Sequence, residues 1–157
     1  MVDVAKKPET LRRAIAACRV RLGEAAARTM REGLASKGDV EAAARIAGIQ
    51  ASKRTAELIP LCHPLRTSSV AIDLEFESET VLGVSATVTG VDRTGFEMEA
   101  MVGCTIAALT VYDMLKSIHK GIVVDNVRLL FKSGGKSGDW KLEDRESGDP
   151  NLEGAGS

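Results

Sequence analysis

The stretch FEMEAMVGCTIAALTVYDMLKSIHK, residues 96–120, constrains the fold more than any other part of the chain. Its pattern predicts one long helix that is apolar over most of its circumference. Such a helix is not stable on a surface, because a surface helix keeps one polar face toward water. The rest of the chain must therefore surround this helix and bury it.

A β-hairpin is the clearest of the remaining elements. In residues 67–77, TSSVAIDLEFE, the apolar side chains Val70, Ile72, Leu74 and Phe76 alternate with polar ones. Residues 81–89, VLGVSATVT, alternate in the same way after a short turn. This pattern predicts two antiparallel strands with one buried and one solvated face.

The other segments complete an α+β pattern. Residues 11–22 alternate as a strand around Cys18, Val20 and Leu22, although residues 14–17 would suit a helix equally well. We predict helices over residues 24–34 and 40–58, with Asp39 as the N-cap of the second, and a last strand over residues 122–132. The predicted fold is an α+β, ferredoxin-like sandwich with helices packed on one face of a mostly antiparallel four-stranded sheet.

Composition limits the class of protein. The 157 residues, 44% hydrophobic with a net charge of −1, suit one domain, which we place at residues 1–141, followed by a polar tail at 142–157 that we expect to be disordered. The near-zero charge and 3% aromatic content argue against binding to nucleic acid or to a membrane. Three widely spaced cysteines and no long apolar run indicate a reduced, cytoplasmic protein.

Charged residues interrupt the long apolar helix. Asp113 and Lys116 are three positions apart and share one helix face. A surface ion pair is the simpler interpretation, and a lysine poised by a carboxylate at the floor of a cleft is the functional one. Glu97 and Glu99 suit the positive end of the helix, but Glu99 also lies near the stripe of Asp113, close to four turns earlier.

Lysines also accompany two glycine-containing turns. Lys37 precedes a helix start, where a cation beside free backbone N–H groups suits phosphate, although a solvated loop lysine is the commoner case. The run KSGGKSG, residues 132–138, is not a P-loop, because Leu130 stands where the first glycine is needed and no helix follows. Lys132 and Lys136 instead frame a flexible turn whose glycine N–H groups can form an anion nest.

Residues 58–65, LIPLCHPL, place a Cys-His pair between two prolines. Proline makes the residue before it extended, so we expect Ile59 and His63 to be extended and the preceding helix to end here. A metal site needs more ligands, and His119, the only other histidine, more simply caps a helix end. Adjacent side chains of an extended segment point to opposite faces, which weakens a Cys-His nucleophile; we expect His63 to face ligand and Cys62 to face the core.

Three long stretches resemble the cyclic pyranopterin monophosphate synthase family of molybdenum cofactor biosynthesis. They are residues 37–65, KGDVEAAARIAGIQASKRTAELIPLCHPL, residues 94–117, TGFEMEAMVGCTIAALTVYDMLKS, and residues 127–139, VRLLFKSGGKSGD. The resemblance covers about residues 1–141 and implies a ferredoxin-like fold. It also implies a homodimer that assembles into a homohexamer, a trimer of dimers, with the active site at the dimer interface.

The resemblance implies site residues by matching motif. The implied catalytic residues are Asp113, Lys116 and Lys37, and the implied substrate-binding residues are Leu61, Cys62, His63, Met98, Glu99, Glu97 and Lys132. No residue is implied as a metal ligand. We expect Lys116, tuned by Asp113, to act as a general acid or base. Lys37 and Lys132 would hold phosphates or move protons, and His63, aimed at the cleft of Asp113 and Lys116, would orient the substrate.

The implied reaction converts (8S)-3′,8-cyclo-7,8-dihydroguanosine 5′-triphosphate to cyclic pyranopterin monophosphate and diphosphate, which is a phosphorus–oxygen lyase reaction. Without a redox step it needs no flavin, nicotinamide or iron–sulfur cofactor. The sequence offers no dedicated cage for magnesium, so any magnesium would arrive with the substrate triphosphate. Two alternatives remain: a non-catalytic nucleotide- or pterin-binding module on the same fold, and an assembly or scaffold protein.

Overall fold

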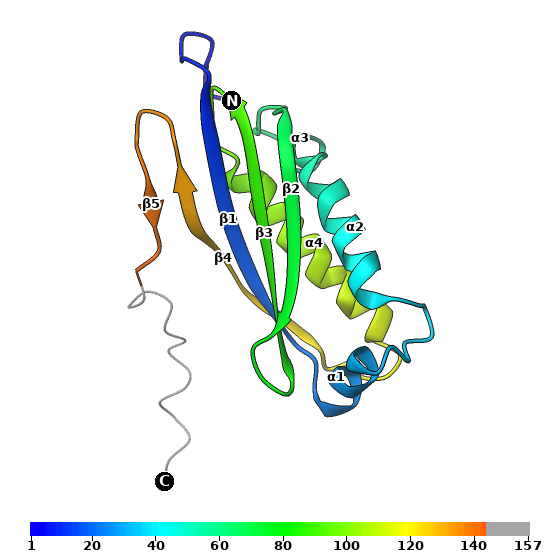
Figure 1. Ribbon diagram of the computed structural model, residues 1–157. Coiled ribbons are helices and arrows are strands. Elements are labelled where there is room, and N and C mark those ends of the chain that lie inside the picture. The colour runs from blue at the N-terminus through cyan, green and yellow to red at the C-terminus, as the bar shows by residue number, and fades with distance from the viewer. Residues whose placement is uncertain (144–157) are drawn as a thin grey trace.

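An antiparallel sheet forms one layer of the molecule and helices form the other (Figure 1). The structure is a computed structural model, and it describes residues 1–143. The sheet order is β2-β3-β1-β4-β5, and the strands are β1 Thr10–Arg21, β2 Thr67–Phe76, β3 Val81–Asp92, β4 Val123–Ser133 and β5 Trp140–Lys141. The helices are α1 Glu24–Arg31, α2 Val40–Ser52, α3 Thr55–Leu58 and α4 Glu97–Leu115. The predicted α+β sandwich with helices on one face of the sheet is confirmed.

The predicted hairpin is present, and its apolar side faces the helices. Strands β2 and β3 pair antiparallel, with Ile72 opposite Ala86 and Leu74 opposite Val84. Every second side chain of β3, from Leu82 to Val88, is at most 1% exposed. The same alternation buries every second residue of β1 from Ala14 to Val20, so residues 14–17 are strand and not helix.

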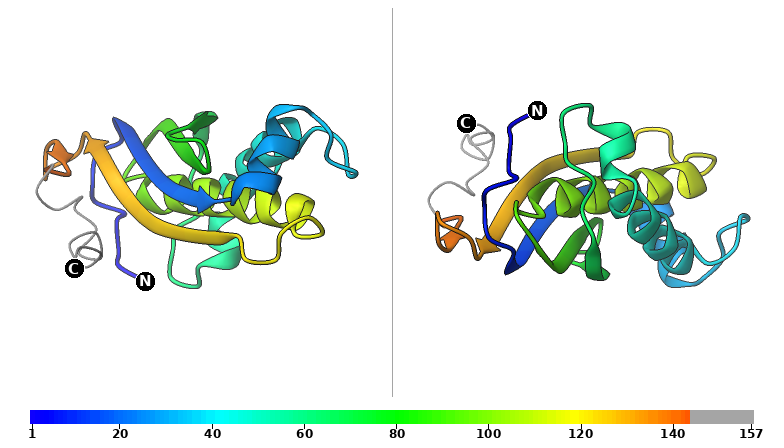
Figure 2. Two further views of the ribbon diagram at one scale, coloured as in Figure 1. Left: turned by 90° about the horizontal axis from the view of Figure 1, so that it is seen from below. Right: turned by 90° about the horizontal axis from the view of Figure 1, so that it is seen from above.

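Helix α4 packs against strands β1, β3 and β4 and against α2, which lies beside it and contacts β2, so α4 is covered on several sides, as its apolar circumference requires (Figure 2). By length and composition α4 could cross a membrane, but its buried residues pack inside the domain, as those of a core helix do. Small residues let α2 approach closely: a Cβ on Gly48 would lie 2.8 Å from the carbonyl oxygen of Gly103. Helix α2 therefore packs closely on α4 through its small residues.

The predicted helix over residues 40–58 is two helices. The chain turns at Lys53 and Arg54, which separates α2 from α3. Hydroxyl groups explain the interruption, because Ser52 Oγ donates to the Glu99 carbonyl at 2.9 Å and Thr55 Oγ1 donates to the Ser52 carbonyl at 3.0 Å. The predicted N-cap is confirmed: Asp39 accepts a hydrogen bond from the Ala42 N–H at 3.0 Å.

Other boundaries also differ from the prediction: α1 ends at Arg31, three residues earlier than predicted, and β3 continues to Asp92. The glycine-rich run after β4 turns the chain back on itself, and β5 pairs with Phe131 and Lys132 as a short fifth strand. Three glycines of that turn, Gly134, Gly135 and Gly138, have positive φ. Helix α4 ends at Leu115, five residues earlier than predicted. Residues 144–157 of the predicted tail lie outside the described residues.

Candidate functional site

The N-terminal arm, residues 1–9, and the β4–β5 turn lie at the same end of the sheet (Figure 1). Residues of both line a basic cavity of about 810 Å³. Its cationic lining residues are Lys6, Lys7, Arg12, Arg93, Lys132 and Lys136. Glu97, at the start of α4, supplies a carboxylate, 3.8 Å from the Lys132 ammonium group. So many cations around one cavity suit a ligand with several negative charges.

Arg12 is held rigidly in this cavity by backbone groups. Its Nε donates to the Asp92 carbonyl at 2.9 Å, and its Nη2 donates to the Arg93 carbonyl at 3.2 Å. The glycine turn closes over the same guanidinium, because a Cβ on Gly135 would collide with the Arg12 side chain. Glycine at this position therefore lets the chain pass close to the arginine.

Arg93 attaches the N-terminal arm to the body of the domain. Its Nη1 donates to the Ala5 carbonyl at 3.0 Å, and its Nε lies 3.6 Å from a carboxylate oxygen of Glu9. These contacts place Lys6 and Lys7 in the lining of the basic cavity. The arm is thus part of the site and does more than precede the first strand.

A second cavity, of about 420 Å³, adjoins the basic one and shares Lys7, Thr94, Gly95 and Glu97 with it. Both Cys62 and His63 line this second cavity. The expectation that Cys62 faces the core is therefore wrong, because the segment around Pro64 is irregular and does not keep the alternation of a strand. Ile59 is extended, with φ −110° and ψ 106°, as predicted.

Glu99 is the buried carboxyl group of the second cavity. It is 4% exposed and lies in the first turn of α4. Burial raises the pKa of Glu99 from the usual 4.5 to about 7, a backbone hydrogen bond opposes the shift, and the charges of Glu97 and Asp92 add to it. A carboxyl group with this pKa can exchange a proton with a ligand near neutral pH.

The Cys62 thiol does not act as an activated nucleophile here. Burial raises the pKa of Cys62, and the charge of Glu99 raises it further. A raised pKa keeps the sulfur protonated, whereas a nucleophilic cysteine needs a lowered one.

The three predicted catalytic residues form a separate cluster at the C-terminal end of α4. Asp113 Oδ2 accepts from the Lys37 ammonium group at 2.6 Å, and Asp113 Oδ1 lies 2.6 Å from the Lys116 ammonium group. Lys37 also donates to the Asp113 backbone carbonyl at 3.0 Å. The loop between α1 and α2 therefore brings Lys37 to the end of α4.

The charges of this cluster stabilise one another in their ionised forms. The hydrogen bonds from Lys116 and Lys37 lower the pKa of Asp113 to about 2. In turn Asp113 raises the pKa of Lys116 through the same hydrogen bond. Lys116 is therefore an ammonium group at neutral pH, which makes it a proton donor or an anion ligand.

The structure brings seven of the predicted site residues together and places the other three elsewhere. Leu61, Cys62, His63, Met98, Glu99, Glu97 and Lys132 all line the two joined cavities. Fourteen helical residues separate Glu99 from Asp113, which corresponds to roughly 21 Å along the axis of α4. Within one protomer, the expectation that His63 is aimed at a cleft with Asp113 and Lys116 is therefore wrong.

Four cavity cations were missed as site residues: Lys6, Lys7, Arg12 and Arg93. A signal existed, since the paired lysines and the arginine crowd into the first twelve residues of a chain with almost no net charge. The missing information was spatial. The sequence does not say that this arm lies against the β4–β5 turn and the start of α4.

The fold and the two joined cavities define an α+β protein with a bipartite cavity, one part lined by cations and the other containing a buried carboxyl group. Comparison with known proteins makes this class more specific. A family model described as the MoaC family matches residues 1–135, and the chain belongs to that family.

Three relatives carry the same name, cyclic pyranopterin monophosphate synthase. The protein from Thermomicrobium roseum is 54% identical over 148 residues, which cover 94% of this chain and 89% of that protein. The protein from Pelobacter propionicus is 50% identical over 145 residues, which cover 92% of this chain and 91% of that protein. The protein from Listeria monocytogenes serovar 1/2a is 47% identical over 143 residues, which cover 91% of this chain and 89% of that protein.

Proposed function

We propose that this protein is a cyclic pyranopterin monophosphate synthase. It converts (8S)-3′,8-cyclo-7,8-dihydroguanosine 5′-triphosphate to cyclic pyranopterin monophosphate and releases diphosphate, as a lyase of molybdenum cofactor biosynthesis. The observation that carries the proposal is the pair of joined cavities, one rich in cations and one with a buried, neutral-range carboxyl group. A triphosphate attached to a polar heterocycle needs both environments at once.

The triphosphate occupies the basic cavity. Arg12 is pre-organised for this role, because its guanidinium is fixed by two backbone carbonyls before any ligand arrives. Lys132 lies between Glu97 and the Ser137 hydroxyl, to which it donates at 2.8 Å, so it can exchange these partners for a phosphate oxygen. Lys6, Lys7 and Lys136 add charge at the rim.

The heterocycle occupies the second cavity, where proton transfers take place. Glu99 holds or releases a proton near pH 7, and His63 orients the ring system. Lys116, kept as an ammonium group by Asp113, donates a proton, and Lys37 binds the developing negative charge. Magnesium, where it is needed, arrives with the triphosphate.

One protomer does not complete this site, because the cavities and the Asp113 cluster lie at opposite ends of α4. We propose that a homodimer brings the Asp113 cluster of one protomer to the cavities of its partner, in both directions across a two-fold axis. Such dimers assemble into a homohexamer in the cytoplasm. The roles of Lys37, Asp113 and Lys116 therefore depend on assembly.

Incubation with the cyclic triphosphate and measurement of diphosphate release test the proposal. The expected result is stoichiometric release of diphosphate and formation of the cyclic monophosphate. Saturable binding of the substrate without turnover contradicts the proposal and supports a non-catalytic nucleotide- or pterin-binding module. Replacing Arg12 by Ala is expected to raise KM, whereas replacing Arg13, which points away from the cavity, leaves KM unchanged.

A further inference from the structure

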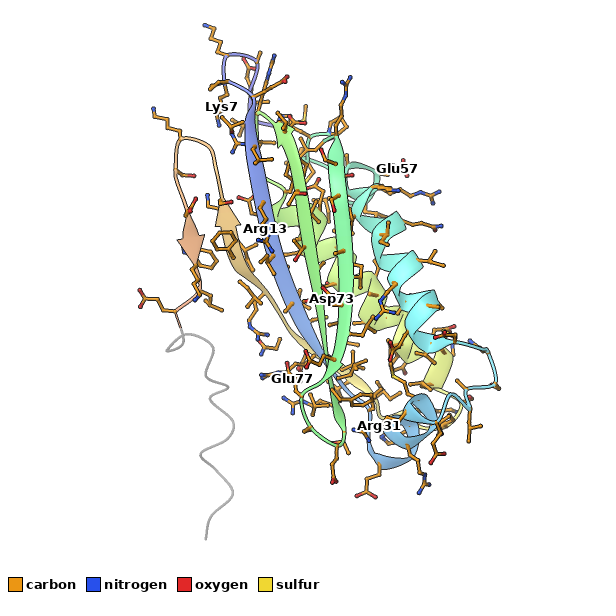
Figure 3. All side chains as sticks on the ribbon, in the orientation of Figure 1. Lys7, Arg13, Arg31, Glu57, Asp73 and Glu77 are labelled. Carbon is orange, nitrogen blue, oxygen red and sulfur yellow. The ribbon has the colours of Figure 1, made fainter. Side chains whose placement is uncertain are left out.

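The N-terminal arm, residues 1–9, crosses the boundary between the two cavities. Val2 and Val4 line the second cavity, and Lys7 lines both cavities. Strand β1 begins only at Thr10, so the arm is not part of the sheet. Figure 3 shows Lys7 on this arm, at the end of the sheet. One short segment outside the sheet therefore supplies wall to both halves of the site.

A local turn gives the arm its shape. The carboxylate of Asp3 accepts a hydrogen bond from the Ala5 N–H at 2.8 Å, and the Lys7 N–H donates to the Val4 carbonyl at 3.0 Å. An aspartate that accepts from the backbone two residues further on stabilises a turn without help from the rest of the protein. In the structure of residues 1–143, Asp3 lines neither of the two cavities, so its effect on the shape of the arm is separable from contact with a ligand.

One side chain joins the arm to the body of the domain. Within residues 1–143, the hydrogen bonds and ion pairs that cross from the arm to the body are those of Arg93 with the Ala5 carbonyl and with Glu9. Val2 is 73% exposed, so the arm buries little surface against the body. A segment with few buried contacts detaches at a low free-energy cost. The arm can therefore open to admit a ligand and close again over it.

The boundary between the cavities has a defined place in the substrate. With the heterocycle in one cavity and the triphosphate in the other, the phosphate nearest the heterocycle lies where the cavities meet. Lys7 stands at this boundary, and an ammonium group on a flexible side chain suits a phosphate oxygen. Val2 and Val4 offer apolar surface on the heterocycle side, as ligand cavities commonly do.

We propose that the N-terminal arm is a substrate-binding strap that closes across both cavities. In the closed form Lys7 binds the phosphate at the boundary, and Val4 covers the heterocycle. Asp3 and Arg93 are positioning residues, because Asp3 shapes the strap and Arg93 holds it on the body. The identity of the ligand rests on the proposed function. The strap binds substrate and transition state alike, so its loss raises KM and leaves kcat nearly unchanged.

Two substitutions of Asp3 test the strap in steady-state assays of diphosphate release. Asp3→Ala removes the acceptor of the Ala5 N–H and is expected to raise KM for the cyclic triphosphate roughly 3–10-fold, the worth of one hydrogen bond. Loss of negative charge alone has the opposite sign, because it strengthens the attraction of the basic cavity for an anion and lowers KM. Asp3→Asn removes the same charge but keeps an oxygen acceptor, so its KM is expected to stay at or below that of wild type.

Trypsin reports closure of the strap without turnover. The bond between the exposed Lys6 and Lys7 lies within the arm, and proteolysis of such a segment follows the population of its open form. Adding the cyclic triphosphate is expected to slow release of residues 1–6 severalfold in wild type and in Asp3→Asn, and less in Asp3→Ala. A synthetic peptide of residues 1–12 in the same solution shows that trypsin itself stays active.

The two measurements separate the strap from the proposed function. An unchanged KM in Asp3→Ala overturns the strap, and so does a KM that rises equally in Asp3→Asn. Diphosphate release at the wild-type rate with no slowing of cleavage overturns the strap and leaves the proposed function standing. Slowed cleavage by the cyclic triphosphate without any diphosphate release supports the strap and contradicts the proposed function.

Discussion

Glu99 shows how much a single side chain depends on its surroundings. By sequence it is one of two glutamates at a helix start, where a charged carboxylate is favourable. In the structure it is almost fully buried beside Cys62 and His63, and burial raises its pKa to about 7. The same residue type two positions earlier, Glu97, is only half-buried and pairs with Lys132.

The Glu99 pKa predicts a pH-dependent stability. Between pH 4.5 and 7 the folded protein keeps a proton on Glu99 that the unfolded chain loses. The contribution of Glu99 to the free energy of unfolding is therefore full below pH 4.5 and is lost as the pH rises through about 7. The free energy of unfolding of the wild type, relative to Glu99→Gln, is expected to fall by roughly 3 kcal/mol over this range. Denaturant unfolding of both proteins at fixed concentration measures this difference.

Glu97→Gln is the matched control, and its difference from wild type is expected to vary less with pH, because Glu97 is more exposed. A wild-type-minus-Glu99→Gln difference that stays constant from pH 4.5 to 8 contradicts a protonated, buried Glu99.

Asp113 is predicted to matter for catalysis and little for the fold. Asn in its place cannot hold two ammonium groups by charge, so Lys37 and Lys116 lose their positions, and we expect kcat to fall by about 10²–10⁴-fold. Thermal unfolding is expected to stay near that of wild type, because all three side chains are about half exposed. Steady-state assays compare this variant with Glu57→Gln, and equal kcat values would remove Asp113 from the mechanism.

Single residues also mark the limit of sequence-based prediction. The pairing of Asp113 with Lys116 follows from helix spacing, and the structure contains it. The approach of Lys37 to the same carboxylate depends on how the α1–α2 loop folds against α4, which no local pattern encodes. The basic N-terminal arm was not predicted as part of the site for the same reason: Lys7 and Arg93 line one cavity only through tertiary structure.

At the scale of elements, the contact between α2 and α4 depends on two facing glycines. A Cβ on Gly48 would lie 2.8 Å from the Gly103 carbonyl oxygen and 2.9 Å from Ile72. We expect Gly48→Ala to lower the free energy of unfolding by about 1–3 kcal/mol through overpacking, despite the better helix propensity of alanine. Urea unfolding measures the change.

The control uses the exposed side of the same helix. Ala42→Gly there changes only helix propensity and is expected to cost about 1 kcal/mol or less. A Gly48→Ala protein that is more stable than wild type would mean that α2 and α4 are not in close contact.

Elements with a strong period were predictable, and short ones were not. The alternation in β2 and β3 gave both the strands and their buried side, because the pleat alone decides which residues face the helices. The break between α2 and α3 depends on a hydrogen bond from Ser52 to a carbonyl of α4, which is a long-range contact. The two residues of β5 form a strand only because β4 offers its edge.

At the scale of the whole molecule, α4 sets the distance between the two parts of the site. The cavities with Glu99 and His63 lie at its beginning, and the cluster of Asp113 lies roughly 21 Å further along. A rigid helix cannot bring its own ends together. Assembly of two copies is therefore the central claim of the proposed mechanism, in which each active site contains residues of both copies.

Complementation between two inactive variants tests this claim most directly. Asp113→Asn and His63→Ala are co-expressed at equal levels, and diphosphate release by the purified mixture is compared with that of each variant alone. With shared sites, half of the dimers are mixed and each mixed dimer holds one intact site, so activity is expected to return to about a quarter of wild type. Activity that stays at the level of the single variants would contradict an active site shared between two protomers.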